Sequence, residues 1–451
     1  MFYTSDLITQ YLPWYFMASQ HLKSFSLPHF VNGIYGNGYP LLAQGETGIL
    51  SPINSIILFI FPFFVAIYLL YLIYFLISII GTFLFLREYK CTNLSSILGG
   101  LIFALSGFMV TRYFQPSIIF SSALLPFGLY LILKANTSKR FLFFLAPLIY
   151  LQITAGHLQM ALISTFTYIL FSAFQVNLNK KSLIFFIKFL TVIAFGFLLS
   201  AIQLLPSHKL FELSERKNWD PNIRYSYSLP PQHLITYVKP YAFGFSKPGD
   251  DLGFRQFGGG FWEINLTIWT IPFILSLAPL FYVLKNKNRQ IIVLYLIWIF
   301  FIALSLGGFF KPYRIINLIH DFPFRAPARF LLVATFIASA LSAMGFEYIT
   351  KNLRRHLKLT IFFLVLASIF FQQMILYRTY FIFNNPTKIN HDLINKKATL
   401  ITPLKLDWKN QKLDRKSFRD EFYKGVTVSL LSLFVLYTWY LKEKGTNKKR
   451  N

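Results

Sequence analysis

The sequence predicts an all-α integral membrane protein, a polytopic bundle of about eleven transmembrane helices whose extracytoplasmic loops carry short helices. Two observations support this class. Of the 451 residues, 55% are hydrophobic and only 14% are charged, which lies outside the range of ordinary soluble domains. Apolar runs such as residues 63–86 are long enough to cross the hydrocarbon core of a bilayer, which needs about 20 helical residues.

The formal charge of +27 does not indicate a nucleic-acid partner, because much of it lies in short loops between apolar runs. Lysine and arginine in such loops hold one face of a membrane, so the expected partner is the lipid bilayer. The single cysteine, Cys91, excludes an internal disulfide and any multi-cysteine metal site. We expect it to be a small apolar filler.

Hydropathy predicts the transmembrane spans in order along the chain. They lie near residues 66–86, 91–110, 117–133, 141–155, 157–175, 183–205, 262–284, 290–307, 329–349, 359–378 and 426–441. The corresponding organisation is a first extracytoplasmic loop (1–62), transmembrane helices (63–205), an extracytoplasmic loop (206–261), further transmembrane helices (262–378), a reduced extracytoplasmic segment (379–425), and the last transmembrane helix with a basic tail (426–451).

Alternate loops are basic and almost free of acids, which places them in the cytoplasm by the positive-inside rule. They carry Arg87, Lys90, Lys134, Lys139, Arg140, Lys180, Lys181, Lys285, Lys287, Arg289, Lys351, Arg354, Arg355, Lys358 and the tail "KEKGTNKKRN". Segment 379–425 is also lysine-rich, but long loops translocate largely regardless of charge. We therefore expect a multi-pass protein of the inner or plasma membrane with a cytoplasmic C-terminus and residues 1–50 outside.

Residues 5–28 predict an amphipathic helix at the membrane interface, capped by Ser5 or Asp6. The aromatic and aliphatic side chains that would be buried there are Leu7, Tyr11, Trp14 and Tyr15. A glycine-rich stretch follows, which predicts tight turns. Residues 53–61 are apolar but too short to span a bilayer, so we expect a re-entrant or lateral helix.

Seven stretches occur in the same order as in a known family. They are "SDLITQYLPW" (5–14), "GYPLLAQGETGILSPIN" (38–54), "TAGHLQMAL" (154–162), "AIQLLPSHKLFELSER" (201–216), "LPPQHLITYVKPYAFG" (229–244), "PYRIINLIHDFPFRAPARFLLV" (312–333) and "YKGVTVSLLSL" (423–433). With them the chain resembles the YfhO-type bacterial membrane proteins of the GT-C superfamily of glycosyltransferases. It departs from that family in two ways. The first transmembrane helix, expected before Asp6, is missing, through a misplaced start codon, through loss, or because the N-terminus translocates unaided. The large domain that commonly precedes the last helix is reduced to 379–425.

The resemblance implies a GT-C-like fold whose catalytic carboxylate, on the outer face, maps to Asp6. Sugar transfer from a polyprenyl-phosphate donor needs a base for the acceptor hydroxyl or a group that stabilises oxocarbenium-like charge. A carboxylate at the membrane surface can do either. The alternative role of Asp6 is a helix N-cap.

Further residues are expected to bind substrate. Gln10 and Tyr11 follow Asp6, and Glu46 is the other acid of the first loop, either a second ligand or base or a solvated carboxylate. His157 and Gln159 lie at a glycine-marked break between two spans, where we expect them to line the site as hydrogen-bonding groups rather than to be core residues.

The outer loops carry three arginine candidates. Arg325 and Arg329 are expected to share one helix face that begins near Pro327 and to hold the donor phosphate, or else to anchor lipid headgroups. Arg255 lies in the glycine-rich loop 249–263, which is either a lid over the acceptor or an ordinary loop. No metal site is assignable: a divalent ion on Asp6 and Glu46 is an open alternative, and Asp250 with Asp251 is too weak a signal.

The sequence therefore favours a glycosyltransferase that moves a sugar from a polyprenyl-phosphate carrier to an extracytoplasmic cell-envelope polymer, lipid or protein. Two alternatives come from other classes. One is a lipid-linked sugar flippase or transporter, although the inverted repeats typical of transporters are not evident. The other is a non-catalytic membrane assembly subunit.

Overall fold

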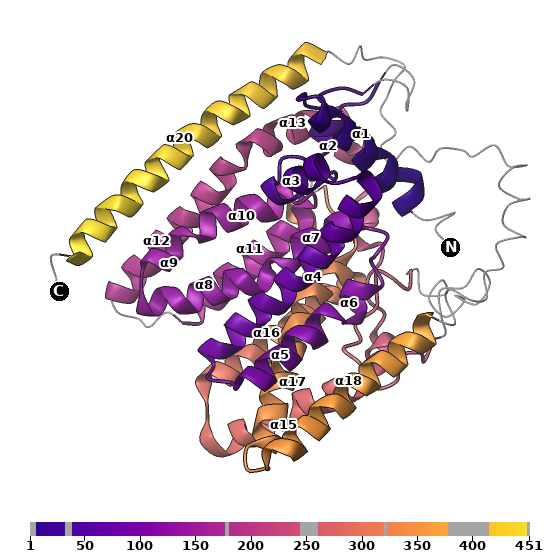
Figure 1. Ribbon diagram of the computed structural model, residues 1–451, viewed down its shortest axis with the longest axis vertical. Coiled ribbons are helices and arrows are strands. Elements are labelled where there is room, and N and C mark those ends of the chain that lie inside the picture. Colours follow the sequence, from indigo (N-terminus) through magenta and orange to yellow (C-terminus); the bar gives the residue numbers. More distant parts are fainter. Residues whose placement is uncertain are drawn as a thin grey trace, which may run out of the picture. The chain divides into compact units, whose positions relative to one another are not determined.

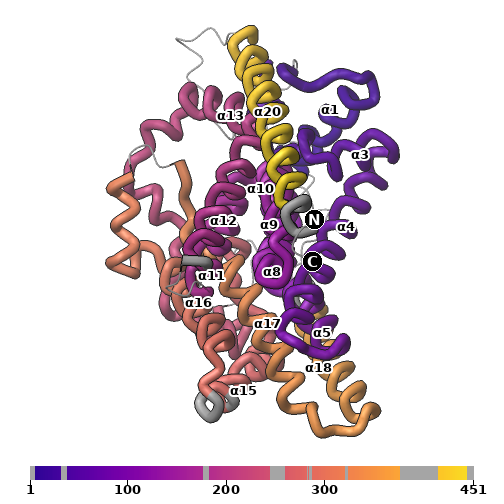
Figure 2. Tube along the Cα trace, turned by 90° about the vertical axis from the view of Figure 1, so that its left-hand side faces the viewer, coloured from indigo at the N-terminus to yellow at the C-terminus, as the bar shows by residue number. Residues whose placement is uncertain are grey.

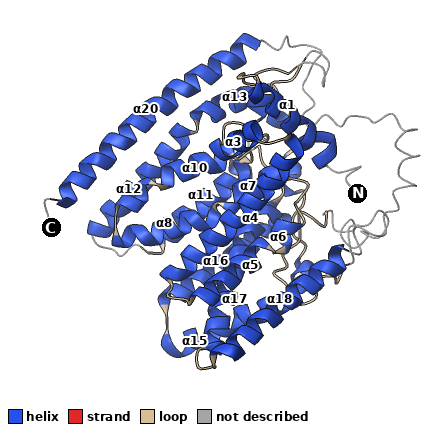
Figure 3. Ribbon diagram, in the orientation of Figure 1, coloured by secondary structure: helices blue, strands red, loops and turns tan. Residues whose placement is uncertain are grey.

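The computed structural model describes residues 6–31, 38–175, 180–243, 260–319, 323–377 and 415–448. These residues are mainly helical and contain no β-strand, only an isolated bridge between Val31 and Tyr39 (Figures 1 and 3). The predicted all-α class is confirmed. The chain divides into two compact units: unit 1 comprises Met1–Thr9, Ser78–Phe114 and Asn218–Pro403, and unit 2 comprises Gln10–Ile77, Gln115–Lys217 and Leu404–Asn451.

Six helices are long and apolar enough to cross a membrane. They are Phe63–Glu88, Pro116–Thr137, Ser182–Leu199, Pro327–Thr350, Arg355–Ile375 and Arg415–Glu443. Five shorter apolar helices lie where further spans are predicted: Asn93–Ala104, Arg140–Thr154, Leu158–Ala173, Thr270–Phe281 and Arg289–Ser305. The outward face of α4 (Phe63–Glu88) is strongly apolar, with Phe64 and Tyr68 largely exposed, as expected for a helix in contact with lipid.

Unit 1 is built around α17 (Leu331–Thr350), which Figure 2 labels. Most residues of this helix are buried. The other elements of unit 1 are α5 (Asn93–Ala104), α6 (Gly107–Val110), η3 (Pro221–Tyr225), η4 (Pro231–Tyr237), α15 (Thr270–Asn286), α16 (Arg289–Ser305), η5 (Gly307–Phe309), η6 (Lys311–Leu318), η7 (Pro327–Phe330) and α18 (Arg355–Tyr377). Small residues let the neighbours of α17 approach closely. A Cβ on Gly345 would lie 1.9 Å from the Leu275 carbonyl oxygen of α15, and one on Gly99 of α5 would lie 2.8 Å from the Cβ of Ala343.

Unit 2 holds most of the remaining helices. They are α1 (Leu12–Lys23), α2 (Leu41–Gln44), α3 (Pro52–Ile60), α7 (Pro116–Ala123), α8 (Leu125–Thr137), α9 (Arg140–Phe143), α10 (Leu145–Thr154), α11 (Leu158–Ala173), α12 (Lys180–Leu199), α13 (Ala201–Glu212) and α20 (Arg415–Lys448). Three of the divisions between the units fall within α4, the π-helix η1 (Leu7–Tyr11) and the 3₁₀ turn η2 (Glu215–Asn218), and another lies between α6 and α7. The helices α13 and α20 pack tightly, because Gly425 leaves no Cβ against the Ala201 carbonyl and Ser429 Oγ accepts from the Ile202 N–H at 3.2 Å.

Three predicted boundaries are wrong. The span expected at 262–284 begins only at Thr270, since residues 260–269 are not helical. There Asn265 Oδ1 accepts from the Thr267 N–H at 3.2 Å and Thr267 Oγ1 from the Trp269 N–H at 2.9 Å, local bonds that compete with a helix. The span expected at 183–205 is divided at Ser200 between α12 and α13. The last helix starts at Arg415, so the end of segment 379–425 is helical, while residues 378–414 lie outside the described part.

The first segment is helical as expected, but it does not lie as an interfacial helix would. Leu7, Tyr11, Trp14 and Tyr15 are all buried by the protein itself. Trp14 stacks on Tyr39 with ring centroids 6.0 Å apart, inside a cluster that contains residues of α13 and α20. The short apolar helix expected at 53–61 is confirmed as α3, which packs on α1 through the bond from Ser19 Oγ to the Leu58 carbonyl at 3.0 Å.

The contact between α15 and α17 gives the first testable prediction. A Gly→Ala change inside a helix usually favours the helix by about 0.5–1 kcal/mol. At Gly345 the new methyl group would collide with backbone, and overpacking of this kind costs about 1–3 kcal/mol. Gly345→Ala should therefore lower the midpoint of thermal unfolding of the detergent-purified protein. The control is Gly308→Ala, where the nearest atom to the new Cβ is 3.4 Å away; equal midpoints for both variants would contradict the close approach.

Candidate functional site

The predicted catalytic residue, Asp6, is exposed and lies directly before the π-helix η1. A π-helical turn is rare in proteins and is found frequently at functional sites, because it changes the direction of side chains on one turn. Gln10 and Tyr11 lie on this turn. Ser5, the alternative cap, lies outside the described residues.

Three of the expected substrate-binding residues meet in unit 2. The Tyr11 hydroxyl donates to Glu46 Oε2 at 2.6 Å, and Gln10 Nε2 donates to the same oxygen at 3.4 Å. The Tyr11 hydroxyl is also 3.1 Å from Ser117 Oγ, on α7. Bonds to an ionised acceptor are short and strong, so the orientation of the Glu46 carboxylate is well defined.

The backbone around Glu46 is fixed by glycines and by α13. Gly45 (φ 81°) ends α2 in the left-handed region, and Gly48 (φ 60°) closes the turn by donating to the Gly45 carbonyl at 2.9 Å. Gln203 Nε2 donates to the Leu42 carbonyl at 3.0 Å, and Ser207 Oγ to the Ala43 carbonyl at 2.7 Å. The carboxylate is thus presented from a tightly held loop.

His157 and Gln159 lie at the break between α10 and α11, as predicted. Gly156 (φ 122°) touches the backbone of Glu46: a Cβ there would lie 2.9 Å from the Glu46 carbonyl oxygen. The His157 N–H donates to Ser121 Oγ at 3.1 Å, and Gln159 is buried in the first turn of α11. The backbone of the break between α10 and α11 therefore lies against the backbone of the Glu46 loop.

Other polar residues near Glu46 were not predicted. Burial first, and then the neighbouring Tyr71, Tyr74 and Glu46, raise the pKa of Tyr15 well above its usual value, so this phenol stays neutral. The Tyr74 hydroxyl donates to Asn54 Oδ1 at 2.8 Å. A polar residue such as Asn54 inside an apolar stretch is the sequence signal that would have found this cluster.

A second constellation, in unit 1, joins two arginines to one acid. Arg112 Nη2 donates to Glu263 Oε2 at 3.1 Å and to the Glu263 carbonyl at 2.8 Å, while Arg329 Nη2 donates to Glu263 Oε1 at 2.9 Å. The side chains of Arg112 and Glu263 are 0% and 3% exposed, and that of Arg329 is 12% exposed. Arg112 was not among the predicted site residues, although a lone arginine in the short segment 111–116 was a usable signal.

The electrostatics of this triad favour the ionised acid. Burial alone would raise the pKa of Glu263, but the charges and hydrogen bonds of Arg329 and Arg112 outweigh it and lower the pKa to about 2. Burial lowers the pKa of Arg112 to about 10, although Glu263 favours its charged form. With two guanidinium groups for one carboxylate, the triad carries a net positive charge and joins three backbone segments.

The two predicted phosphate-binding arginines do not share a helix face. Ala326 is left-handed (φ 61°) and the helical turn η7 begins after it at Pro327, which confirms proline at the start but leaves Arg325 outside the helix. Arg325 is exposed, with its guanidinium carbon 5.6 Å from the ring centroids of Trp219 and Tyr227. Of these two arginines, only Arg329 belongs to the triad with Arg112 and Glu263.

Arg255, with Asp250 and Asp251, lies outside the residues that the structure describes. Within the described residues, no group of three or more histidine, cysteine or acidic side chains is placed to hold a metal ion. No family model, curated protein or solved structure matches this chain. The resemblance to the GT-C superfamily therefore rests on the ordered sequence stretches alone.

The triad gives a prediction for stability and its pH dependence. Glu263→Gln leaves two buried guanidinium groups without a counter-charge, a change that costs about 3–5 kcal/mol. Since the pKa of Glu263 lies below its usual value of 4.5 in the folded state, its contribution is complete above about pH 4.5 and is lost as the pH falls toward 2.

Thermal unfolding across pH 2–7 measures both effects. The parent should lose stability over the acid window, and Glu263→Gln should be less stable at pH 7 and lack that component of the slope. Glu212→Gln is the control, because its contacts with Lys209 and His208 are solvent-exposed and worth less than about 1 kcal/mol. Identical acid profiles for the parent and Glu263→Gln would refute the assignment.

Proposed function

We propose that this protein is a GT-C-type integral-membrane glycosyltransferase with about eleven spans. It transfers a sugar from a polyprenyl-phosphate donor to an extracytoplasmic polymer, lipid or protein of the cell envelope. One observation supports the proposal most strongly. The exposed Asp6 precedes a π-helical turn, and the last two residues of that turn, Gln10 and Tyr11, donate hydrogen bonds to a second carboxylate, Glu46. The apolar helices, suited to a bilayer and to a polyprenyl tail, support it.

In this proposal the two carboxylates have different roles. Asp6 is exposed, so an acceptor hydroxyl or the anomeric centre can reach it, and it acts as the base or stabilises oxocarbenium-like charge. Glu46 accepts bonds from Tyr11 and Gln10 on Oε2, and the carboxylate held in this way orients a sugar hydroxyl. His157 and Gln159 complete the polar lining.

The arginines serve the donor in the same proposal. Arg325 is exposed and contacts the phosphate, whereas Arg329 is held by Glu263 and contributes positive charge and the position of η7. The catalytic side is extracytoplasmic, because the basic loops, which the positive-inside rule assigns to the cytoplasm, alternate with the loops that carry the proposed site.

The test uses purified full-length protein with a labelled polyprenyl-phosphate sugar and envelope extract. Label moving to an envelope acceptor supports the proposal. Lipid scrambling without transfer would favour the flippase alternative, and neither activity would favour an assembly subunit.

The first variant to test is Asp6→Asn. Loss of a general base lowers turnover by about 100-fold or more, whereas an exposed Asp→Asn change leaves the fold intact. Transfer should therefore fall by this factor with an unchanged unfolding midpoint. Asp420→Asn, another exposed acid, is the control and should transfer normally. Near-normal transfer by Asp6→Asn would remove Asp6 from the chemistry.

The second variant, Tyr11→Phe, keeps the ring but removes the bond to Glu46. A hydrogen bond to a charged group is worth about 1.5–3 kcal/mol, and the freed carboxylate no longer has a fixed direction. We expect KM for the sugar substrate to rise more than kcat falls. Tyr150→Phe, which loses only a bond to the Leu50 carbonyl, is the matched control. Equal kinetics for the two variants would contradict a substrate role for Glu46.

A further inference from the structure

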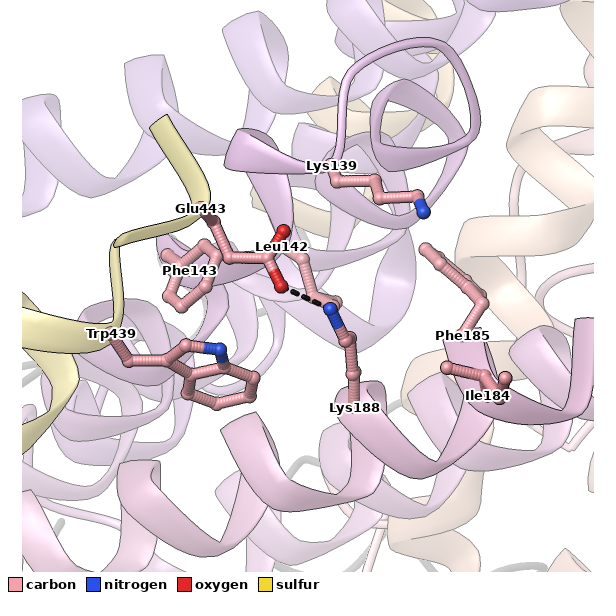
Figure 4. Close-up of a pocket in the computed structure, with 8 residues that line it drawn as sticks. All are labelled: Lys139, Leu142, Phe143, Ile184, Phe185, Lys188, Trp439 and Glu443. Atoms are coloured by element: carbon pink, nitrogen blue, oxygen red, sulfur yellow. Dashed lines mark hydrogen bonds and ion pairs between the residues drawn. The ribbon is translucent and has the colours of Figure 1, made fainter. Parts of the chain in front are cut away.

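A small pocket lies in unit 2, where α9, α12 and α20 come together, far along the chain from the Glu46 loop (Figure 4). Its lining residues are Lys139, Leu142, Phe143, Ile184, Phe185, Lys188, Trp439 and Glu443. Aromatic and aliphatic side chains form most of its walls, and Trp439 packs edge-on against Phe143 with centroids 4.8 Å apart. The polar groups are confined to two lysines and one acid.

The charge of the pocket is positive. Lys188 forms an ion pair with Glu443, as the dashed line in Figure 4 marks. The chain contains no aspartate or glutamate between Glu88 and Glu212, so the only acid of the pocket comes from α20. Lys139 is exposed and has no carboxylate partner among the described residues, and in Figure 4 its ammonium group points away from the ion pair.

Apolar surface continues outward from the pocket. Ile184 and Ile187 of α12 are 45% and 55% exposed, and Leu441 of α20 is 45% exposed. These helices are among those apolar enough to cross a bilayer, and their outer faces are mostly unburied. At the end of such helices, aromatic rings lie at the level of the lipid headgroups and a basic group attracts an anionic headgroup, while the apolar helix faces contact the acyl chains.

We propose that the rim of this pocket binds one anionic phospholipid. The phosphate lies at Lys139, Trp439 packs at the level of the glycerol backbone, and an acyl chain follows the exposed face of α12 and α20. The apolar walls favour a lipid over free phosphate, because an inorganic anion gains nothing from them and loses solvation. The proposal concerns binding alone and does not depend on sugar transfer.

The test is lipid titration of the delipidated, detergent-purified full chain, followed by native mass spectrometry. Phosphatidylglycerol should bind at least about fivefold more tightly than phosphatidylcholine with the same acyl chains, the difference expected for one lysine near an anionic lipid. Lys139→Gln should lose that preference, and Lys139→Arg should keep it. Lys217→Gln, an exposed lysine outside the pocket, is the control and should bind as the parent does.

Three outcomes would overturn the proposal. They are equal binding of the two lipids by the parent, an unchanged preference in Lys139→Gln, and displacement of phosphatidylglycerol by inorganic phosphate at similar concentration. The last would indicate a free-anion site. Because Lys139 is exposed, its replacement leaves the packing intact, which unchanged unfolding midpoints of all variants verify.

Discussion

In an apolar environment every backbone N–H and C=O must form its hydrogen bond inside the protein. The structure of unit 1 depends on how its non-helical backbone forms these hydrogen bonds. Residues 260–269 are buried and irregular. Their groups bind neighbouring segments: the Gly107 N–H donates to the Thr267 carbonyl at 2.8 Å, Trp269 Nε1 to the Leu105 carbonyl at 2.7 Å, and Arg112 to the Glu263 carbonyl at 2.8 Å. The buried charges of the triad belong to the same network, since Arg112 serves the backbone and the carboxylate together.

The carboxylates of Glu263, Glu46 and Asp6 differ in their burial and in the groups that the protein places against them. Glu263 is buried between two guanidinium groups and has little capacity left for a ligand. Glu46 is half-buried and held on one oxygen by a phenol and an amide. Asp6 is exposed. An exposed acid, or one whose direction is fixed by neutral donors, is better suited to binding a hydroxyl than one that two guanidinium groups neutralise. This is why the proposed chemistry is assigned to Glu46 and Asp6.

Hydropathy located the helices well, because apolar runs of spanning length have few alternatives to a helix. It could not distinguish α17, which is mostly buried, from α4, which is mostly exposed to its surroundings, since both are helices of spanning length and apolar composition. It also misplaced the start of α15, because the decisive bonds of Asn265 and Thr267 are local polar ones that an average of hydrophobicity ignores. At the site, Glu46, Gln10 and Tyr11 were predicted as separate candidates, and their meeting is a long-range contact that no local pattern contains. The pairing of Arg112 with Glu263 is also a long-range contact, although a lone arginine in the short segment 111–116 was a usable signal for Arg112 itself.

The close packing of α13 on α20 has a consequence for biosynthesis. Gly425 and Ser429 of α20 pack on residues near position 200, at the start of α13. The helix α20 therefore leaves the ribosome long after the surface of α13 that it covers. Unit 2 contains α13 in its segment Gln115–Lys217 and α20 in its segment Leu404–Asn451, and most of unit 1 lies between these two segments in sequence. Because domains generally fold as they emerge, unit 1 has its whole helical core available while α13 still has an uncovered face. The emergence of α20, rather than the insertion of the earlier helices, then sets the moment at which the loop that carries Glu46 acquires its final support.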